Sequence, residues 1–455
     1  MSPRSPVPQR SPSWWWEDLG GPPPPRAPLE GDVEADVCVV GGGYTGLWTA
    51  YELRRADPSL SVVVVEREHV GFGASGRNGG WLVGDLSLGS RLRRTAGPEG
   101  VAALERAVAG TVDAVAAVCA EEGIDCDLVK GGSLTVAQNA PQLDRLARVA
   151  AGTLDGVLLD AAAAAGRVRV AGLRGALFTP HCARIHPAKL VRGLADAAER
   201  RGVRIHERTP ALDVGSGRVR TPAGTVRARW VVRATEGYTA QLPGLRRALL
   251  PLNSAMVVTE PLDAATWAQL GWDGAETLLD GAHAYCYLQR TADGRVAIGG
   301  RGIPYRFGSH TDRAGEVAAR TPEQLRARLT RLFPVLRGVR LDGAWAGVLG
   351  VRRDWAASVH CDRATGLCWA GGYAGEGVAA ANLAARTLRD LILGHDTELT
   401  RLAWVGHDAR AWEPEPLRWL AVHATYATLR TADAIESRTG RPSRLAALAE
   451  ALSGR

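Results

Sequence analysis

The sequence predicts an α/β protein with three parts: a Rossmann-type dinucleotide-binding domain, an interleaved α+β domain built on an antiparallel sheet, and a C-terminal helical extension. Three observations carry this prediction. An apolar run at residues 36–40 leads into a G-x-G-x-x-G motif. Another glycine loop and a helix lie near the other end, at residues 369–393. Between them, residues 252–259, 282–289 and 295–299 have the length and alternation of antiparallel strands.

The first domain begins with the segment D-V-C-V-V-G-G-G-Y-T-G at residues 36–46. A side chain at Gly41 or Gly43 would block the approach of a pyrophosphate to the following helix N-terminus, and Gly46 lets that helix pack close to the sheet. Residues 61–65 predict the second strand, and Glu66 follows it twenty residues after Gly46, where a carboxylate can bond a ribose hydroxyl. The unit is therefore predicted to bind an adenine dinucleotide.

Two further glycine-rich loops favour FAD over NAD. Residues 71–80, G-F-G-A-S-G-R-N-G-G, are too polar for a strand and long enough to wrap an extended ligand. Residues 369–378 read as a strand that runs into a glycine loop, and a helix is expected from about residue 379 to residue 393. NAD needs neither loop, whereas FAD needs an anchor for its flavin ring and a positive dipole beside N1 and O2.

In the order of these motifs, the chain resembles the FAD-dependent oxidoreductases of the D-amino-acid oxidase superfamily, which includes glycine oxidase and sarcosine oxidase. The G-A-S-G-R-N-G-G loop is most similar to that of gamma-glutamylputrescine oxidoreductase-like members, and the resemblance covers about residues 33–394. It implies noncovalent FAD, since no cysteine or histidine matches a flavin-linking position. The cofactor-binding residues that the motifs and the resemblance predict together are Gly41, Gly43, Tyr44, Thr45, Gly46, Glu66, Arg67, Gly73, Ala74, Ser75, Arg77, Asn78, Gly79, Gly80, Ala211, Ala234, Thr235, Gly372, Gly375, Glu376, Gly377 and Val378.

The remaining elements give a discontinuous domain division. Residues 101–122 and 142–151 have helical apolar spacing, residues 184–190 open an amphipathic helix, and residues 202–206 and 226–234 read as strands. The predicted parts are a proline-rich N-terminal arm (1–29), an FAD-binding domain (30–95, 184–245 and 344–396), a substrate domain (96–183 and 246–343) and a C-terminal helical extension (397–455).

Both ends of the chain carry segments without an assigned chemistry. Residues 22–25 are four prolines, so the arm is expected to be extended or disordered. The tryptophans at 14–16 are too apolar to remain exposed to water, and we expect them to pack on the body of the molecule or on a second subunit. The weaker alternative is that they form a lid that faces the substrate. Helices are predicted at about 417–435 and 443–452, as packing or oligomer elements.

Composition places limits on localisation and partners. The chain has 46% hydrophobic and 23% charged residues, and it carries no run long enough to span a membrane. Its net charge of +7 comes from scattered arginines without a basic block, so no nucleic-acid partner is expected. Seven scattered cysteines without a C-x-x-C pair predict reduced thiols, no metal site and, with no signal peptide, a cytoplasmic protein.

The expected chemistry is hydride transfer from a substrate carbon to flavin N5, for which an amine must be neutral. No side chain is assigned a catalytic role. Because side chains alternate along a strand, Tyr285, Tyr287 and Gln289 are predicted to share one face and Arg290 to lie on the other. Arg290 is expected either to form an ion pair or to contact the substrate. Tyr373 and Glu376 complete the substrate candidates. Glu376 either caps the following helix or turns outward, or it pairs with a cationic amine.

Three functions compete. The leading one is an FAD-dependent oxidoreductase that oxidises the C–N bond of an amine or amino acid to an imine, which hydrolyses. The alternatives are an FAD-dependent 2-hydroxy acid dehydrogenase, and a flavoprotein without turnover, basic RNA-associated flavoproteins included. The electron acceptor is O2 or another compound, because residues 295–299 lack the lysine that sarcosine oxidase-like members place over the flavin. A homo-oligomer is left open.

Overall fold

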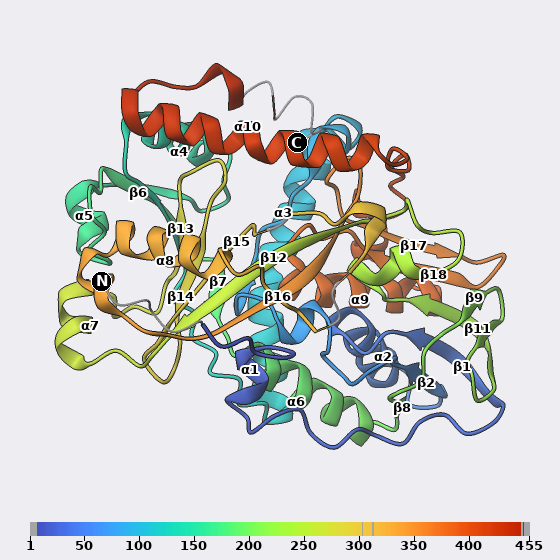
Figure 1. The fold of residues 1–455 in the computed structure, drawn as a ribbon. Coiled ribbons are helices and arrows are strands. Elements are labelled where there is room, and N and C mark those ends of the chain that lie inside the picture. The colour runs from blue at the N-terminus through green and yellow to red at the C-terminus, as the bar shows by residue number, and fades with distance from the viewer. Residues whose placement is uncertain (1–6, 303, 312–313, 447–448, 450–455) are drawn as a thin grey trace.

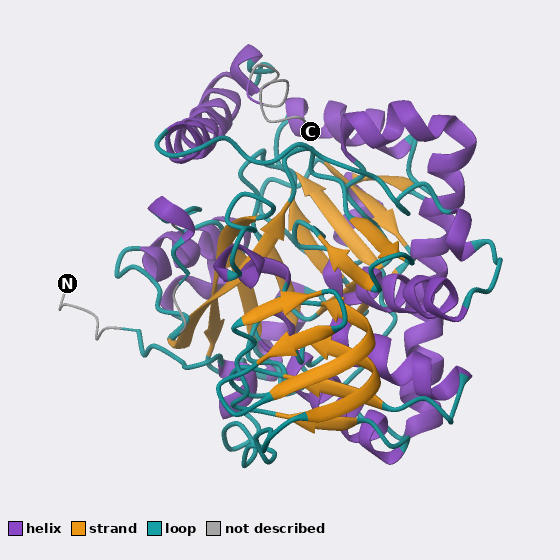
Figure 2. Cartoon of the chain, turned by 90° about the vertical axis from the view of Figure 1, so that its right-hand side faces the viewer, coloured by secondary structure: helices purple, strands orange, loops and turns teal. Residues whose placement is uncertain are grey.

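The computed structural model describes residues 7–302, 304–311, 314–446 and 449 (Figure 1). Within them the chain is an α/β protein with two large sheets and a small two-stranded one, as the sequence predicts. Figure 2 shows the strands gathered in two groups with helices along their outer faces. No helix among the described residues has the length and apolar character needed to cross a bilayer.

The first large sheet has the parallel core of a dinucleotide-binding domain. Its strand order is β17-β18-β11-β1-β2-β8, with β10 and β9 attached to β11. β18, β11, β1, β2 and β8 run parallel, because each returns through a crossover connection. The strand bounds are β1 (Val33–Val40), β2 (Val62–Val65), β8 (Arg204–His206), β9 (Asp213–Gly215), β10 (Arg218–Arg220), β11 (Thr225–Arg233), β17 (Ser358–Asp362) and β18 (Leu367–Gly371).

The second large sheet is antiparallel except where β13 pairs with β4. Its order is β16-β12-β15-β14-β13-β4-β6-β5, and the predicted boundary at residue 344 falls inside β16, which pairs with β12 along its length. The strand bounds are β4 (Ser133–Ala137), β5 (Val157–Asp160), β6 (Gly175–Thr179), β12 (Leu250–Thr259), β13 (Thr277–Asp280), β14 (Tyr287–Arg290), β15 (Val296–Gly300) and β16 (Leu341–Val351); the two-stranded sheet pairs β3 (Trp81–Val83) with β7 (Cys182–Arg184).

Helices cover both sheets. α2 packs against α6 and α9 on the parallel sheet, and α10 lies near α4 at the antiparallel sheet (Figure 1). The helix bounds are α1 (Trp14–Glu17), α2 (Tyr44–Ala56), α3 (Gly89–Glu122), α4 (Ala140–Ala150), α5 (Ala161–Ala165), α6 (Pro187–Arg200), α7 (Ala264–Leu270), α8 (Thr321–Leu332), α9 (Gly377–Leu393) and α10 (Leu417–Thr439).

Two sequence expectations need correction, and a third lies largely outside the described residues. The strand predicted at 282–289 begins only at Tyr287, because the backbone N–H groups of His283 and Ala284 turn to bind the carboxylate of Asp433 on α10. The helix predicted from residue 101 is joined through a kink at Gly97 to a segment that starts at Gly89. The helix predicted at 443–452 is helical at residues 444–446, and most of its remainder lies outside the described residues.

The N-terminal arm packs on the body of the molecule. Residues 14–17 form the short helix α1 instead of an extended segment, and its tryptophans are 6%, 1% and 1% exposed. The indole N–H of Trp15 donates to the carbonyl oxygen of Asn78 at 2.8 Å, inside the second glycine loop, residues 71–80. This confirms docking on the body, and it brings the arm against the loop that was expected to bind the cofactor.

Replacing Gly110 with alanine is expected to stabilise the fold. Gly110 lies in α3, where a Cβ atom would meet no atom within 4 Å, so alanine gains about 0.5–1 kcal/mol of unfolding free energy through its helix propensity. Urea unfolding measures the change. The matched control is Gly123→Ala at the end of the same helix, which also meets open space but has a φ of +68° and is expected to destabilise. Equal shifts for the two variants would contradict this interpretation.

Candidate functional site

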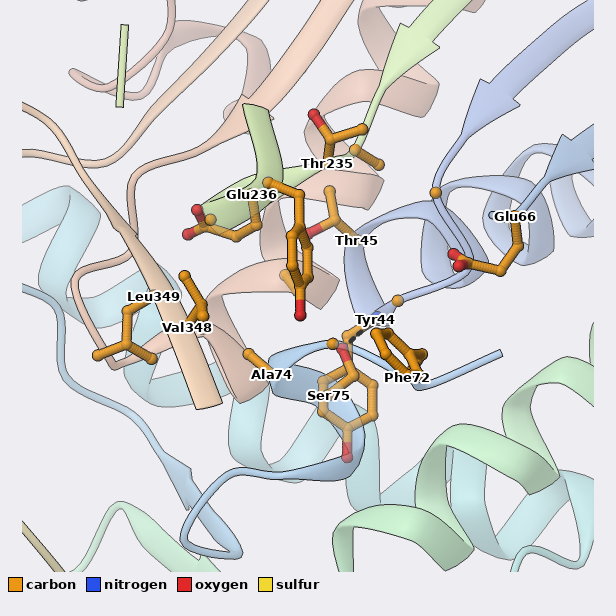
Figure 3. Close-up of a pocket in the computed structure, with 18 of the residues that line it drawn as sticks. Tyr44, Thr45, Glu66, Phe72, Ala74, Ser75, Thr235, Glu236, Val348 and Leu349 are labelled. Carbon is orange, nitrogen blue, oxygen red and sulfur yellow. Dashed lines mark hydrogen bonds between the residues drawn. The ribbon is translucent and has the colours of Figure 1, made fainter. Parts of the chain in front are cut away.

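The site is a cavity lined both by residues of the parallel sheet, such as Val40 and Val65, and by Val348 and Leu349 on β16 of the antiparallel sheet (Figure 3). It encloses about 1390 Å³ of space outside the atoms, part of it open to solvent. Of the predicted cofactor residues, those that line it are Gly41, Gly43, Tyr44, Thr45, Glu66, Arg67, Gly73, Ala74, Ser75, Asn78, Ala211, Ala234, Thr235, Gly375, Gly377 and Val378. The structure thus brings together motifs separated by more than three hundred positions in the sequence.

The first glycine motif forms the turn between β1 and α2. Gly43 stands at the N-cap of α2, and the backbone N–H of Tyr44 donates to the hydroxyl of Ser75 at 2.9 Å. A Cβ atom on Gly41 would lie 2.6 Å from the carbonyl oxygen of Ala234. Gly46 does not line the cavity; a Cβ there would overlap the carbonyl oxygen of Gly41, so this glycine keeps the helix close to the strand.

Glu66 extends from the end of β2 to the same turn. Its carboxylate accepts the backbone N–H groups of Gly42 at 2.7 Å and Glu68 at 2.9 Å. Burial raises the pKa of Glu66 above its ordinary value, and these two N–H groups act against that rise by favouring the charged form. The side chain is half-buried at the cavity wall, where it can accept a ribose hydroxyl.

The second glycine loop wraps the cavity with its first half only. Asn78 braces the turn by donating to the carbonyl oxygens of Ala74 and Ser75 at 3.1 and 3.0 Å. Arg77 points elsewhere: it is 1% exposed, and its Nε donates to the carbonyl oxygen of Phe72 at 2.7 Å. Gly79 and Gly80 also fall outside the cavity lining, since they lead directly into strand β3, which starts at Trp81.

The third glycine loop, residues 369–378, brings the N-terminus of α9 to the cavity. Tyr373 spans the space to α2, where its hydroxyl lies 3.1 Å from that of Thr45. Gly372 and Glu376 are the predicted cofactor residues of this loop that do not line the cavity. Glu376 stands at the N-cap position without capping the helix, and its carboxylate accepts the backbone N–H of Ser87. It therefore does not face the cavity as an amine partner would.

The remaining substrate candidates lie behind the second glycine loop or away from it. Tyr287 bonds Ser254 through its hydroxyl at 2.9 Å, and Gln289 donates to the carbonyl oxygen of Gly79 at 2.8 Å. Arg290 occupies the opposite face and donates to the carbonyl oxygen of Trp272, so the structure favours a structural role for it. Tyr285 precedes β14 and does not line the cavity.

Sequence reasoning missed a group of lining residues. Val348 and Leu349 come from β16, and their apolar strand pattern resembles that of any core strand. Glu236 follows Thr235, but no local pattern shows that its carboxylate would be buried at the cavity. The full set of missed residues is Val40, Val65, Glu68, Phe72, Glu236, Gly237, Tyr238, Gln241, Leu242, Val348, Leu349 and Ala381.

These features suit FAD. The cavity is lined by residues of all three glycine-rich segments together with Glu66, and the absence of a side chain at Gly43, beside Ser75, leaves room for a pyrophosphate at the start of α2. The N-termini of α2 and α9, helices of 13 and 17 residues, supply positive dipole ends at two places along it. Glu66 supplies the ribose acceptor at the end of β2.

Comparisons with known proteins agree with this reading. Residues 36–391 match the DAO family, described as FAD dependent oxidoreductase. The chain is 31% identical over 411 residues to gamma-glutamylputrescine oxidoreductase of Escherichia coli, covering 83% of this chain and 88% of that protein. It is 30% identical over 397 residues to the probable oxidoreductase OrdL of Haemophilus influenzae, covering 82% and 86%.

Solved structures share the fold. Glycine oxidase from Geobacillus kaustophilus superimposes with a TM-score of 0.69 at 23% identity, covering 83% of this chain and 100% of that one. L-proline dehydrogenase from P. horikoshii gives a TM-score of 0.68 at 19% identity, covering 82% and 96%. Because the family match extends over most of its length, the chain belongs to the DAO family of FAD-dependent oxidoreductases.

Proposed function

We propose that this enzyme oxidises the C–N bond of an amine or amino acid to an imine, which water then hydrolyses. One observation carries the proposal: the curated relative that shares 31% identity over most of both chains is a gamma-glutamylputrescine oxidoreductase, and therefore acts on an amine-derived compound. A cytoplasmic location and noncovalent binding of FAD are part of the same proposal.

The residues around the cavity suit such a reaction. FAD supplies, when bound, a two-electron acceptor that takes a hydride at N5. Val348, Leu349 and Val378 present apolar surface at one end of the cavity, and an apolar environment disfavours a charged ammonium group. Gly375 and Gly377 place the N-terminus of α9 where it can stabilise negative charge. The two lysines of the chain are engaged elsewhere, with Asp113 and Asp127.

Anaerobic reduction of the purified holoenzyme tests the substrate class. We expect the yellow flavin absorbance to bleach with an amine or amino acid and not with 2-hydroxy acids, because the proposal makes a C–N bond, and not the C–O bond of a hydroxy acid, the bond that the flavin oxidises. Each candidate is mixed with the enzyme without oxygen, and its reduction rate is followed in a stopped-flow spectrometer. Bleaching by a 2-hydroxy acid alone would support the dehydrogenase alternative, and a flavin that no member of the panel reduces would refute the proposal.

A further inference from the structure

Glu236 is a half-buried residue at a strained backbone position, and one oxygen of its carboxylate, Oε2, is fully enclosed. It follows β11 as the first residue of a short 3-10 turn (Glu236–Gln241), with a φ of +39°, a conformation that non-glycine residues seldom adopt. Such outliers cluster at functional sites, where the surrounding structure holds them in place. Figure 3 draws Glu236 on the side of the cavity where β16 carries Val348 and Leu349.

The carboxyl group of Glu236 joins two segments that border the cavity. Its Oε1 accepts the backbone N–H of Tyr373 at 3.0 Å, which holds the third glycine loop. Its Oε2 sits against β16 so closely that a Cβ atom on Gly350 would overlap it. The glycine loop carries Gly375 and Gly377 to the cavity. Glu236 is therefore placed to set the position of this loop relative to β16.

No counter-charge balances this carboxylate among the described residues. Oε2 is buried, the groups that favour its charge are backbone N–H groups, and no basic side chain among the described residues forms an ion pair with Glu236. The segments packed against it contribute the phenol of Tyr373, whose pKa burial also raises, and the uncharged residues Gly350 and Gly371. Burial raises the pKa of Glu236 to about 7, although backbone N–H groups of Tyr373, Gly372 and Gly350 favour its charged form.

Binding of FAD adds to the cost of a charge at this position. The cofactor brings an anionic diphosphate into the same cavity and displaces water from its walls, and both effects disfavour a carboxylate. We propose that Glu236 is a positioning residue of the cofactor site, which ties the glycine loop at 371–377 to β16, and that FAD binds with this carboxyl group protonated.

Proton linkage gives the proposal a measurable sign. If bound FAD raises the pKa of Glu236 further, the affinity of the protein for FAD is highest at low pH. That affinity then falls as the pH rises through about 7. We expect the Kd for FAD to rise about tenfold between roughly pH 6.5 and pH 8.5. The full-length protein, freed of flavin, is titrated with FAD across this range, and quenching of flavin fluorescence reports binding without any substrate.

Three variants separate this role from a general effect of pH. Glu236→Gln keeps an acceptor for Tyr373 N–H and cannot ionise, so its Kd should match the wild type at pH 6.5 and stay flat. Glu236→Ala lacks the carboxyl group that links the glycine loop to β16, so its Kd for FAD should be more than tenfold higher at every pH. Asp280→Asn is the matched control: Asp280 is a buried carboxyl group with a raised pKa in the substrate domain, outside the cavity, and its variant should keep the wild-type slope.

Two results would overturn the proposal. One is a Glu236→Gln protein whose affinity falls with pH as steeply as the wild type, which would assign the titration to another group such as Glu66. The other is a Glu236→Ala protein that binds FAD as tightly as the wild type. Circular dichroism of each variant establishes that it is folded, and Glu236→Gln, which preserves shape and acceptor, keeps the test decisive if the alanine variant does not fold.

Discussion

Replacing Gly43 with valine is expected to give a folded protein that no longer retains FAD. Gly43 precedes α2 with a φ of −89°, which any residue adopts, so the backbone tolerates the change. Its Cβ atom would lie 3.0 Å from the hydroxyl of Ser75 at the cavity wall, and the two methyl groups of valine would extend into the pyrophosphate's space. We expect the Kd for FAD to rise at least about a hundredfold, equivalent to about 2.7 kcal/mol.

Flavin content after purification and a fluorescence titration of the flavin-free protein measure this loss. Gly46→Ala is the informative comparison, because its added Cβ would overlap the carbonyl oxygen of Gly41 and should lower the Tm as well as flavin content. Gly43→Val should lose flavin with circular dichroism like that of the flavin-free wild type. A folded Gly43→Val protein that is still fully yellow would contradict the placement of the pyrophosphate. Release of the wild-type flavin by heat or acid would confirm that it is noncovalent.

The parts of the site that the sequence could predict depend on local backbone geometry. Gly41 and Gly43 can be recognised because a dinucleotide excludes side chains at fixed spacing from a strand, and Glu66 because it ends the next strand. The parallel sheet and the antiparallel substrate sheet follow from strand length and alternation in the same way. These features can be predicted because residues that are close together in the sequence determine them.

The features that could not be predicted depend on contacts between distant segments. Leu349 reaches the cavity from β16 only because the substrate sheet meets the glycine loops, and Arg77 leaves it to bond the carbonyl oxygen of Phe72. The strand expected at 282–289 is shortened by Asp433, about 150 residues away. The alternation of side chains along β14 correctly places Gln289 and Arg290 on opposite faces of the strand. It cannot predict which of these faces contacts a ligand.

The N-terminal helix α1 supports the cofactor loop from outside. The ring of Trp16 packs 5.1 Å from that of His69, and a Cβ atom on Gly71 or Gly76 would lie 3.0 or 2.5 Å from the indole. The indole therefore covers both ends of the turn whose inner side lines the cavity through Phe72, Gly73, Ala74 and Ser75. The arm is thus a part of the cofactor site's support, although its sequence carries no cofactor motif.

Trp16→Ala is accordingly expected to cost both stability and cofactor affinity. Trp16 is 1% exposed, and truncating such a side chain costs about 3–5 kcal/mol of unfolding free energy. Because the loop at 71–76 loses its outer support, the Kd for FAD should rise about tenfold, which corresponds to about 1.4 kcal/mol. Trp267→Ala provides the matched control: Trp267 is 6% exposed in the core of the substrate domain, so its loss should lower the unfolding free energy similarly and leave the Kd unchanged. Denaturant unfolding and FAD titration of both variants separate the two effects, and equal Kd values for the two variants would show that α1 stabilises the fold without supporting the cofactor loop.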